Sequence, residues 1–371
     1  MSDEALGRVL SPLRKSQRTI ISLVVQAMAA LGQAASIPIA AVVAQRVGSQ
    51  VDSALTRVYR LLHNRRLDDL VLSREMIRTL AKRTTSLLVA LDWTEWHPPL
   101  RMLLASVVVG TRAVPVSAAA FIKTAIQRSQ NCWEDSFLQM LVMVLREAGV
   151  FACFLADRGF RRTSFITLLL KQTDHSFLVR LAENVTVQAK RGSRTLRKWG
   201  LQPGRAVDLG WVDLRQDAAV NIRVVGIWAK GHREPWWLAT NRSDSLAQLA
   251  ALYDRRMAIE EQIRDTKGAR FGFALVWTQI TTPESLARFV VLIGLTVLLL
   301  TAVGHALSQK QANVRLPSKT KGPRLSLLTV GLLFWPVLQN KVVFNLKFLK
   351  THLPPPTLRS FPWLDRYEKG N

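Results

Sequence analysis

The sequence has few cysteines, few acidic residues and no long uninterrupted apolar run. Its 371 residues include only Cys132 and Cys153, which excludes a disulfide scaffold and a cysteine zinc site and fits a reducing compartment. The six histidines show no i, i+4 pairing that would indicate zinc ligands. The start, Met-Ser-Asp-Glu, lacks the basic-then-apolar order of a signal peptide. We therefore expect a cytoplasmic protein.

A membrane-spanning segment is not expected either. The longest apolar run, Phe289 to Val303, has 15 residues and is interrupted by Gly294, Thr296 and Thr301, whereas about 20 residues are needed to cross a bilayer. This run predicts a buried helix and no membrane partner.

Acidic residues are outnumbered by basic ones. The chain has 51 Lys and Arg against 26 Asp and Glu, a net charge of +25. Such a charge predicts attraction to polyanions and binding that weakens as salt rises. Nucleic acid is the expected partner, with a membrane surface as the rival. Residues 285–364 contain ten Lys and Arg and no Asp or Glu, so we assign 309–371 as a basic C-terminal region.

Four residues share an informative spacing: Tyr253, Arg256, Glu260 and Lys267, written Y-x2-R-x3-E-x6-K. On one continuous helix they would lie within about 60° of each other and form a single stripe. The alternative is an ordinary solvated face, because the same segment carries many other charges. Two aspartates elsewhere favour the functional interpretation.

Asp92 and Asp157 each follow a short apolar run typical of a buried strand, Ser86–Leu91 and Phe151–Ala156. Together with Glu260, these acids could hold two divalent cations about 4 Å apart, the arrangement that supports phosphoryl transfer. Magnesium suits such oxygen ligands.

With these motifs in place, the chain resembles the bacterial insertion-sequence transposases of the insertion sequence four family. Asp92, Asp157 and Glu260 look like the DDE triad of those enzymes, and the four spaced residues reproduce their YREK signature. The resemblance covers roughly residues 86–268. It implies catalysis with Mg²⁺, for which Mn²⁺ would substitute, and cut-and-paste transposition with a DNA hairpin intermediate. The implied partners are double-stranded DNA, at the terminal repeats and the target, and a second protomer, in the bacterial nucleoid.

The expected fold is α/β, with a ribonuclease H-like, retroviral integrase-like core. The resemblance and the pattern of strands and helices divide the chain into five regions. These are a helical DNA-binding domain (1–83), the first part of the core (84–184), a β-rich insertion (185–240), the second part of the core with the signature helix (241–308), and the basic region (309–371).

Expected DNA contacts lie outside the triad as well. A helix ending near Gln45, a glycine turn and a helix over Val51–His63 predict a helix-turn-helix that exposes Arg57 and Arg60, with structural packing as the alternative. The insertion begins with a cation-rich stretch around Trp199, which suits stacking on an unpaired base unless it is a solvated loop. The resemblance also implies that a tryptophan of the insertion stacks on a flipped base. We assign this role to Trp237 rather than Trp236, with core packing as the alternative for both. The predicted DNA-binding set is Tyr253, Arg256, Lys267, Trp237, Arg158, Arg161, Lys190, Arg191, Arg194, Arg197, Lys198, Arg57 and Arg60.

Two other functions compete with transposition. One is a DNA-binding repressor without catalysis, against which the intact carboxylates argue. The other is a ribonuclease H-like, structure-specific nuclease that cuts without joining, which strand-transfer products would distinguish.

Overall fold

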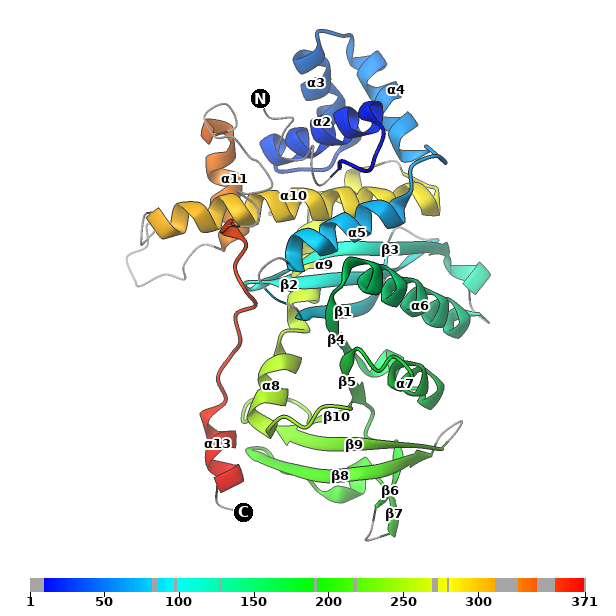
Figure 1. The fold of residues 1–371 in the computed structure, drawn as a ribbon, viewed down its shortest axis with the longest axis vertical. Helices are drawn as coiled ribbons and strands as arrows, with labels where there is room; N and C mark the ends of the chain where they lie inside the picture. Colours follow the sequence, from blue (N-terminus) through cyan, green and yellow to red (C-terminus); the bar gives the residue numbers. More distant parts are fainter. Residues whose placement is uncertain are drawn as a thin grey trace. The chain divides into compact units, whose positions relative to one another are not determined.

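The computed structural model describes residues 10–81, 84, 86–96, 99–126, 129–189, 192–215, 219–268, 273–278, 280–310, 326–338 and 351–369. Within these residues the protein is a mixed α/β protein with N-terminal helices and a ten-stranded mixed sheet (Figure 1). The α-helices are α2 (Lys15–Leu31), α3 (Ser36–Val47), α4 (Val51–Leu62), α5 (Asp69–Leu80), α6 (Gln130–Ala148), α7 (Thr163–Leu170), α8 (Leu246–Asp254), α9 (Met257–Lys267), α10 (Pro283–Lys310), α11 (Leu327–Leu338) and α13 (Pro362–Lys369).

The strands follow the order β3-β2-β1-β4-β5-β10-β9-β8-β6-β7 across the sheet. Their bounds are β1 (Ser86–Glu95), β2 (Leu100–Val109), β3 (Arg112–Ile122), β4 (Phe151–Ala156), β5 (Ser176–Leu181), β6 (Thr186–Ala189), β7 (Gly192–Thr195), β8 (Arg205–Arg215), β9 (Ala219–Trp228) and β10 (Trp236–Thr240). Short 3-10 turns are η2 (Lys123–Ile126), η3 (Arg158–Phe160), η4 (Leu196–Trp199) and η5 (Leu275–Trp277).

The chain divides into two compact units. The first contains residues 1–85, 93–150 and 258–355, and the second contains 86–92, 151–257 and 356–371. Each unit is therefore assembled from segments that are far apart in sequence.

In the first unit, the predicted helix-turn-helix is present as α3 and α4. Gly48 ends α3 in the left-handed conformation, with φ 65°, which glycine adopts without steric cost. On α4 the buried residues Ala54, Val58, Leu61 and Leu62 form one face. The remaining face is left for solvent or a ligand.

The predicted buried helix is α10, which packs along β3 and beneath α2 and α4 (Figure 1). Among the described residues it is the one helix long and apolar enough to cross a membrane by length and composition, yet 94% of its most apolar window is buried inside the protein. A Cβ at Gly294 of this helix would overlap the carbonyl oxygen of Pro115 in β3. Close packing on the sheet thus accounts for its apolar surface.

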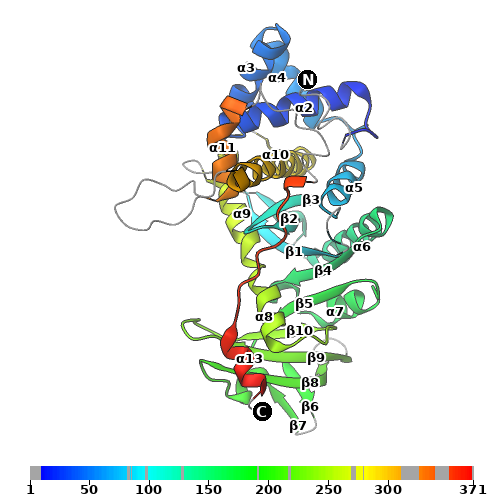
Figure 2. The same cartoon turned by 60° about the vertical axis from the view of Figure 1, so that its left-hand side comes forward.

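Helix α11 packs against α10 (Figure 2). Leu328, Val330 and Trp335 of α11 are buried, whereas Leu333 and Val337 are exposed. The sequence predicts a buried segment over Leu327–Leu338, and the structure shows that it covers α10 with one face only. The sequence also predicts a basic linker from Lys310 to Arg324, which lies almost entirely outside the described residues.

The sequence predicts a hairpin from Leu103–Gly110 and Val114–Phe121, joined at Gly110 and Thr111, and the antiparallel strands β2 and β3 form it. The sequence also predicts a helix around Trp133 to Glu147, which is α6 and packs against α5 in the same unit.

In the second unit, β1, β4 and β5 are parallel neighbours, with the predicted helix α7 before β5. Their residues are buried nearly throughout, as expected for strands covered on both faces.

The predicted β-rich insertion consists of β6 to β10. It does not form a separate sheet, because β10 pairs antiparallel with β5 and the remaining insertion strands continue from β10. The hydrogen-bonding edge of β5 is satisfied by this extension.

The end of the chain packs within the second unit. Helix α13 contacts α8, and both Phe361 and Leu364 are buried. The ring centroid of Phe361 lies 6.4 Å from that of Trp236. Residues 356–369 therefore form part of this unit's apolar packing.

Candidate functional site

The two predicted catalytic aspartates lie at the same point along two neighbouring parallel strands. The paired register of β1 and β4 ends at Leu91 and Ala156, and the next residues are Asp92 and Asp157. Since adjacent strands lie about 4.8 Å apart, both carboxylates lie where the β1–β4 pairing ends in the second unit. One detail of the prediction was wrong: Asp92 does not end its strand, because β1 continues to Glu95.

The signature segment was predicted as one continuous helix, and this prediction was wrong. It forms two helices, α8 and α9, separated by Arg255 and Arg256. The amides of these residues donate to Leu252 and Tyr253, three residues back, at 3.1 and 2.9 Å. This tighter turn interrupts the α-helical ladder. Tyr253 and Arg256 therefore do not share a helical stripe with Glu260.

The break gives Arg256 a specific partner. Its guanidinium Nη1 lies 3.9 Å from the carboxylate Oδ2 of Asp92, and both side chains are largely buried. A buried carboxylate needs a compensating charge, and an arginine in this place provides one. The second residue of the signature is thus paired with the first residue of the predicted triad.

Tyr253 is also directed into the second unit. It is 3% exposed, its hydroxyl donates to the carbonyl of Ala156 at 3.5 Å, and its ring packs edge-on against Trp236 with centroids 5.3 Å apart. The predicted contact with a DNA phosphate would require this phenol to leave its present contacts. In the structure, Tyr253 connects α8 to the end of β4 through its hydrogen bond to Ala156.

Burial raises the pKa of the Tyr253 phenol to about 12, an increase that the positive charges of Arg256 and Arg180 partly offset. Because the folded-state pKa exceeds the ordinary value of 10.0, the phenol's contribution to stability is complete below pH 10 and is lost as the pH rises toward 12. We expect Tyr253→Phe to flatten the decline in unfolding free energy between pH 10 and 12. Urea unfolding at stepped pH measures this, with Tyr59→Phe as the control.

Lys267 docks onto β1 in the first unit. Its Nζ donates to Thr94 Oγ1 at 2.7 Å and to the carbonyl of Glu95, and it lies 5.4 Å from the ring centroid of Trp96. The predicted phosphate-gripping lysine therefore holds the end of α9 to the strand segment that directly follows Asp92.

Glu260 lies in the first turn of α9 and is half-buried. It belongs to the first unit, whereas Asp92 and Asp157 belong to the second. Among the described residues, no group of three or more His, Cys, Asp and Glu side chains is placed to hold a metal ion. The three-carboxylate metal site therefore stays a prediction, and the donor chemistry of the two aspartates where the β1–β4 pairing ends fits a hard cation.

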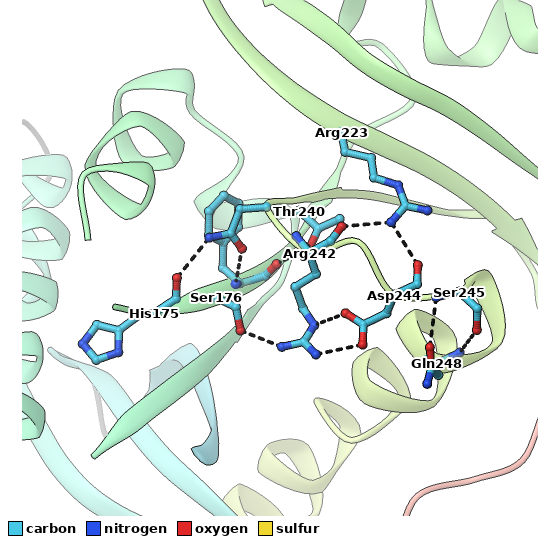
Figure 3. Close-up of polar contacts among 10 residues, drawn as sticks. His175, Ser176, Arg223, Thr240, Arg242, Asp244, Ser245 and Gln248 are labelled. Atoms are coloured by element: carbon cyan, nitrogen blue, oxygen red, sulfur yellow. Dashed lines mark hydrogen bonds and ion pairs between the residues drawn. The ribbon is translucent and has the colours of Figure 1, made fainter. Parts of the chain in front are cut away.

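A polar network fixes the link between β10 and α8 (Figure 3). Arg242 forms two hydrogen bonds with the carboxylate of Asp244, at 2.6 and 2.9 Å, and a third with Ser176 Oγ at 2.8 Å. Arg223 donates to the carbonyls of Arg242 and Asp244, each at 2.9 Å. The network thereby sets where α8 begins.

Ser245 caps the start of α8, as the sequence predicted for Ser243 or Ser245. Its hydroxyl accepts from the amide of Gln248, whose side chain accepts from the Ser245 amide in return. This reciprocal cap orients the helix that carries Tyr253.

Trp237 does not suit the base-stacking role. It is 1% exposed and packs against β9, where a Cβ at Gly226 would come within 2.5 Å of its ring. The core alternative is therefore the one that the structure supports. Trp211 on β8 is 59% exposed instead. The sequence could have indicated this exposure. Val212 and Leu214 are apolar and point inward, and because side chains alternate along a strand, Trp211 points outward.

The predicted basic residues of the second unit have varied surroundings. Arg158 pairs with Glu234 at 3.4 Å, and Arg161 donates to the carbonyl of Arg158. In the insertion, Arg194 lies over Trp199 at 4.6 Å from the ring centroid. Arg197 is exposed, 3.6 Å from Glu183, and Lys198 is exposed as well. Lys190 and Arg191 lie outside the described residues.

Arg57 and Arg60 project from the exposed face of α4, as predicted. They line a groove of about 890 Å³ between α2 and α4. Its floor is apolar, with Ile20, Leu23 and Leu61, and Lys15 adds a third positive charge. The helix-turn-helix geometry is present, and DNA contact by these arginines stays a prediction.

Comparison with known proteins adds no further constraint on this site. No protein-family model matches the chain, and no curated protein matches it either.

Proposed function

We propose that this protein is a DNA transposase that moves its own insertion sequence by metal-dependent phosphoryl transfer. One observation carries the proposal. Asp92 and Asp157 directly follow the last paired residues of the adjacent parallel strands β1 and β4, and the spaced signature is anchored to those two strands. Tyr253 contacts the end of β4, Arg256 contacts Asp92, and Lys267 contacts Thr94.

The strand order supports a ribonuclease H-like core for this enzyme. Such a core has an antiparallel meander followed by parallel strands that add on the other side of the first strand. The observed order β3-β2-β1-β4-β5, with β1, β4 and β5 parallel, agrees with it. Strands β6 to β10 then correspond to the insertion between core and signature.

In this proposal Asp92, Asp157 and Glu260 hold two Mg²⁺ ions, with Mn²⁺ as a substitute. The metal ions would lower the pKa of the attacking hydroxyl and stabilise the leaving oxygen. Arg256 and Lys267 lie on either side of Glu260 in the sequence. Arg256 contacts Asp92, and Lys267 contacts Thr94, which lies two residues further along β1. They would position α9 and take up phosphates of the DNA strand. The catalytic side chains themselves form no covalent bond to DNA.

The DNA-binding surfaces follow from the exposed cations. Arg57 and Arg60 on α4 would contact the terminal repeat, and Arg197 and Lys198 in the insertion would hold the strand near the cut. Trp211 replaces Trp237 as the insertion tryptophan available to stack on an extruded base. A second protomer would complete the DNA complex.

The Arg256–Asp92 ion pair gives a prediction about metal binding. Arg256 supplies the positive charge that a metal ion would bring to Asp92. We expect Arg256→Gln to lower the melting temperature, because it removes a positive charge beside a largely buried carboxylate, a change that typically costs about 3–5 kcal/mol. Millimolar Ca²⁺ should restore much of this loss in the variant and raise the wild-type melting temperature far less, since a ligand that binds only the folded state stabilises it.

The control is the double variant Asp92→Asn, Arg256→Gln, in which the carboxylate is also removed. It should gain nothing from Ca²⁺ beyond the effect of NaCl at equal ionic strength. An equal response of all three proteins to Ca²⁺ would show that Asp92 is not a cation ligand.

The function itself is tested with a plasmid carrying this gene and several hundred flanking base pairs, incubated with the protein and either Mg²⁺ or EDTA. Metal-dependent release of the gene-bearing fragment, with closed hairpin ends on a denaturing gel, is expected. Joining of a supplied 3′ hydroxyl end to target DNA separates a transposase from a nuclease that only cuts. Salt-sensitive binding with no cleavage would favour the repressor.

A further inference from the structure

Three aromatic rings form a row in the first unit, and one of them comes from β1, the strand that also carries Asp92. Trp93 comes from β1, Phe121 from the end of β3, and Trp133 from the first turn of α6. The ring centroids are 5.8 Å apart between Trp93 and Phe121 and 4.8 Å apart between Phe121 and Trp133. The three rings are in contact although they come from three different elements.

Hydrogen bonds hold Trp93 in one orientation. Its Nε1 donates to Glu134 Oε1 at 2.8 Å, and the same oxygen accepts from the side-chain Nε2 of Gln130 at 2.9 Å. The Glu134 residue is buried, so this acid is turned away from solvent. The indole is thus fixed before any ligand arrives, which reduces the entropy lost on binding.

The other end of the row is open to solvent. Trp133 is 44% exposed. An exposed tryptophan in contact with a second ring is unusual for a core, which would cover both. The row therefore has a fixed end at Trp93 and an accessible face at Trp133.

Two cations border the row. The guanidinium of Arg101 lies 4.9 Å from the Trp93 ring centroid, and it donates to the side-chain amide oxygen of Gln130 at 2.7 Å. The Lys123 side chain is half exposed and pairs with the exposed Glu95 at 2.6 Å. A surface pair of this kind is weak and easily exchanged for another anion.

We propose that Trp93, Phe121 and Trp133 form a stacking surface for unpaired nucleobases of DNA, with Arg101 and Lys123 holding the adjoining phosphates. Aromatic side chains interleaved with cations are what single-stranded nucleic acid requires, since every base has a face that can stack. A protein partner would be the rival occupant, but a net charge of +25 favours a polyanion.

Binding of fluorescent oligonucleotides tests the proposal without requiring cleavage. The probes are a blunt duplex, the same duplex with a four-nucleotide unpaired flap, and the flap sequence alone, all in EDTA. Wild type should bind the flapped duplex about tenfold more tightly than the blunt one. Trp133→Ala should abolish that preference and change blunt-duplex binding less than about twofold, whereas Trp133→Phe should retain part of it.

Trp277→Ala is the matched control, because Trp277 is an exposed tryptophan of the same unit, at 58%, and lies outside the row. It should keep the wild-type preference. Equal binding of blunt and flapped DNA by the wild type would overturn the proposal, as would a preference that survives Trp133→Ala. A wild-type dimer that Trp133→Ala converts to monomers in sedimentation would assign the surface to a second copy instead. A flap preference without any cleavage would retain this proposal and reject the transposase.

Discussion

Replacing Asp157 with asparagine is expected to lower magnesium-dependent DNA end cleavage at least about a thousandfold. The change removes a negative charge from one of the two carboxylates where the β1–β4 pairing ends, and metal-assisted phosphoryl transfer depends on such ligands. The fold should tolerate it, because Asp157 Oδ1 accepts a hydrogen bond from the amide of Gly159 at 2.8 Å. An asparagine Oδ1 can accept the same bond. Glu260→Ala should be equally inactive.

Three measurements make this result specific. The rate of end cleavage is compared in Mg²⁺ and EDTA, duplex DNA affinity is measured by anisotropy, and the melting temperature reports folding. Affinity and melting temperature should stay close to wild type. Asp213→Asn is the matched control, because Asp213 is a carboxylate of the insertion that accepts from Asn221 and should have no role in cleavage. Unchanged cleavage by Asp157→Asn would remove this residue from the chemistry.

Replacing Gly304 with alanine is expected to destabilise the packing of α10 against α11. Gly304 of α10 and Gly331 of α11 let the two helices approach so closely that backbone meets backbone. A Cβ at Gly304 would overlap the carbonyl oxygen of Leu327, and a Cβ at Gly331 would overlap that of Leu300. Alanine favours a helix over glycine by about 1 kcal/mol, but forcing backbone apart in a packed core costs typically 1–3 kcal/mol and sometimes more.

We therefore expect a net loss of about 2 kcal/mol, seen as a lower urea midpoint for the unit that contains α10. Leu333→Ala is the control on the same pair of helices, because Leu333 of α11 is 59% exposed and surface changes usually stay within about 0.5 kcal/mol. A midpoint for Gly304→Ala equal to wild type would show that α10 and α11 are not packed this closely in solution.

The elements that local sequence patterns predict correctly are those whose signals are contained in a few residues. Apolar runs ending in polar residues located β1 and β4, two apolar runs joined at Gly110 and Thr111 located the β2–β3 hairpin, and Gly48 located the end of α3. Cap chemistry located Ser245 at the start of α8. Each of these depends on backbone conformation and on hydrogen bonds between near neighbours.

The failures arose where a side chain's partner is distant in sequence. Nothing between Tyr253 and Lys267 breaks a helix by composition, since that stretch contains no proline or glycine. The turn at Arg255 and Arg256 is accompanied by docking of Arg256 on Asp92, more than 160 residues earlier. Similarly, Trp236 and Trp237 are adjacent in sequence, and only their neighbours on β9 and α8 show that Trp237 is the more buried.

The sequence by itself determined the charge that predicts a polyanionic partner, the order of strands and helices, and the three acids with their spaced signature. Only the tertiary structure decided that the insertion strands continue the main sheet, that Arg256 pairs with Asp92, and that Trp211 is exposed on the insertion while Trp237 is buried. The reason is physical. Periodicity and caps report the local backbone, whereas burial and ion pairing depend on which distant segment supplies the neighbouring surface.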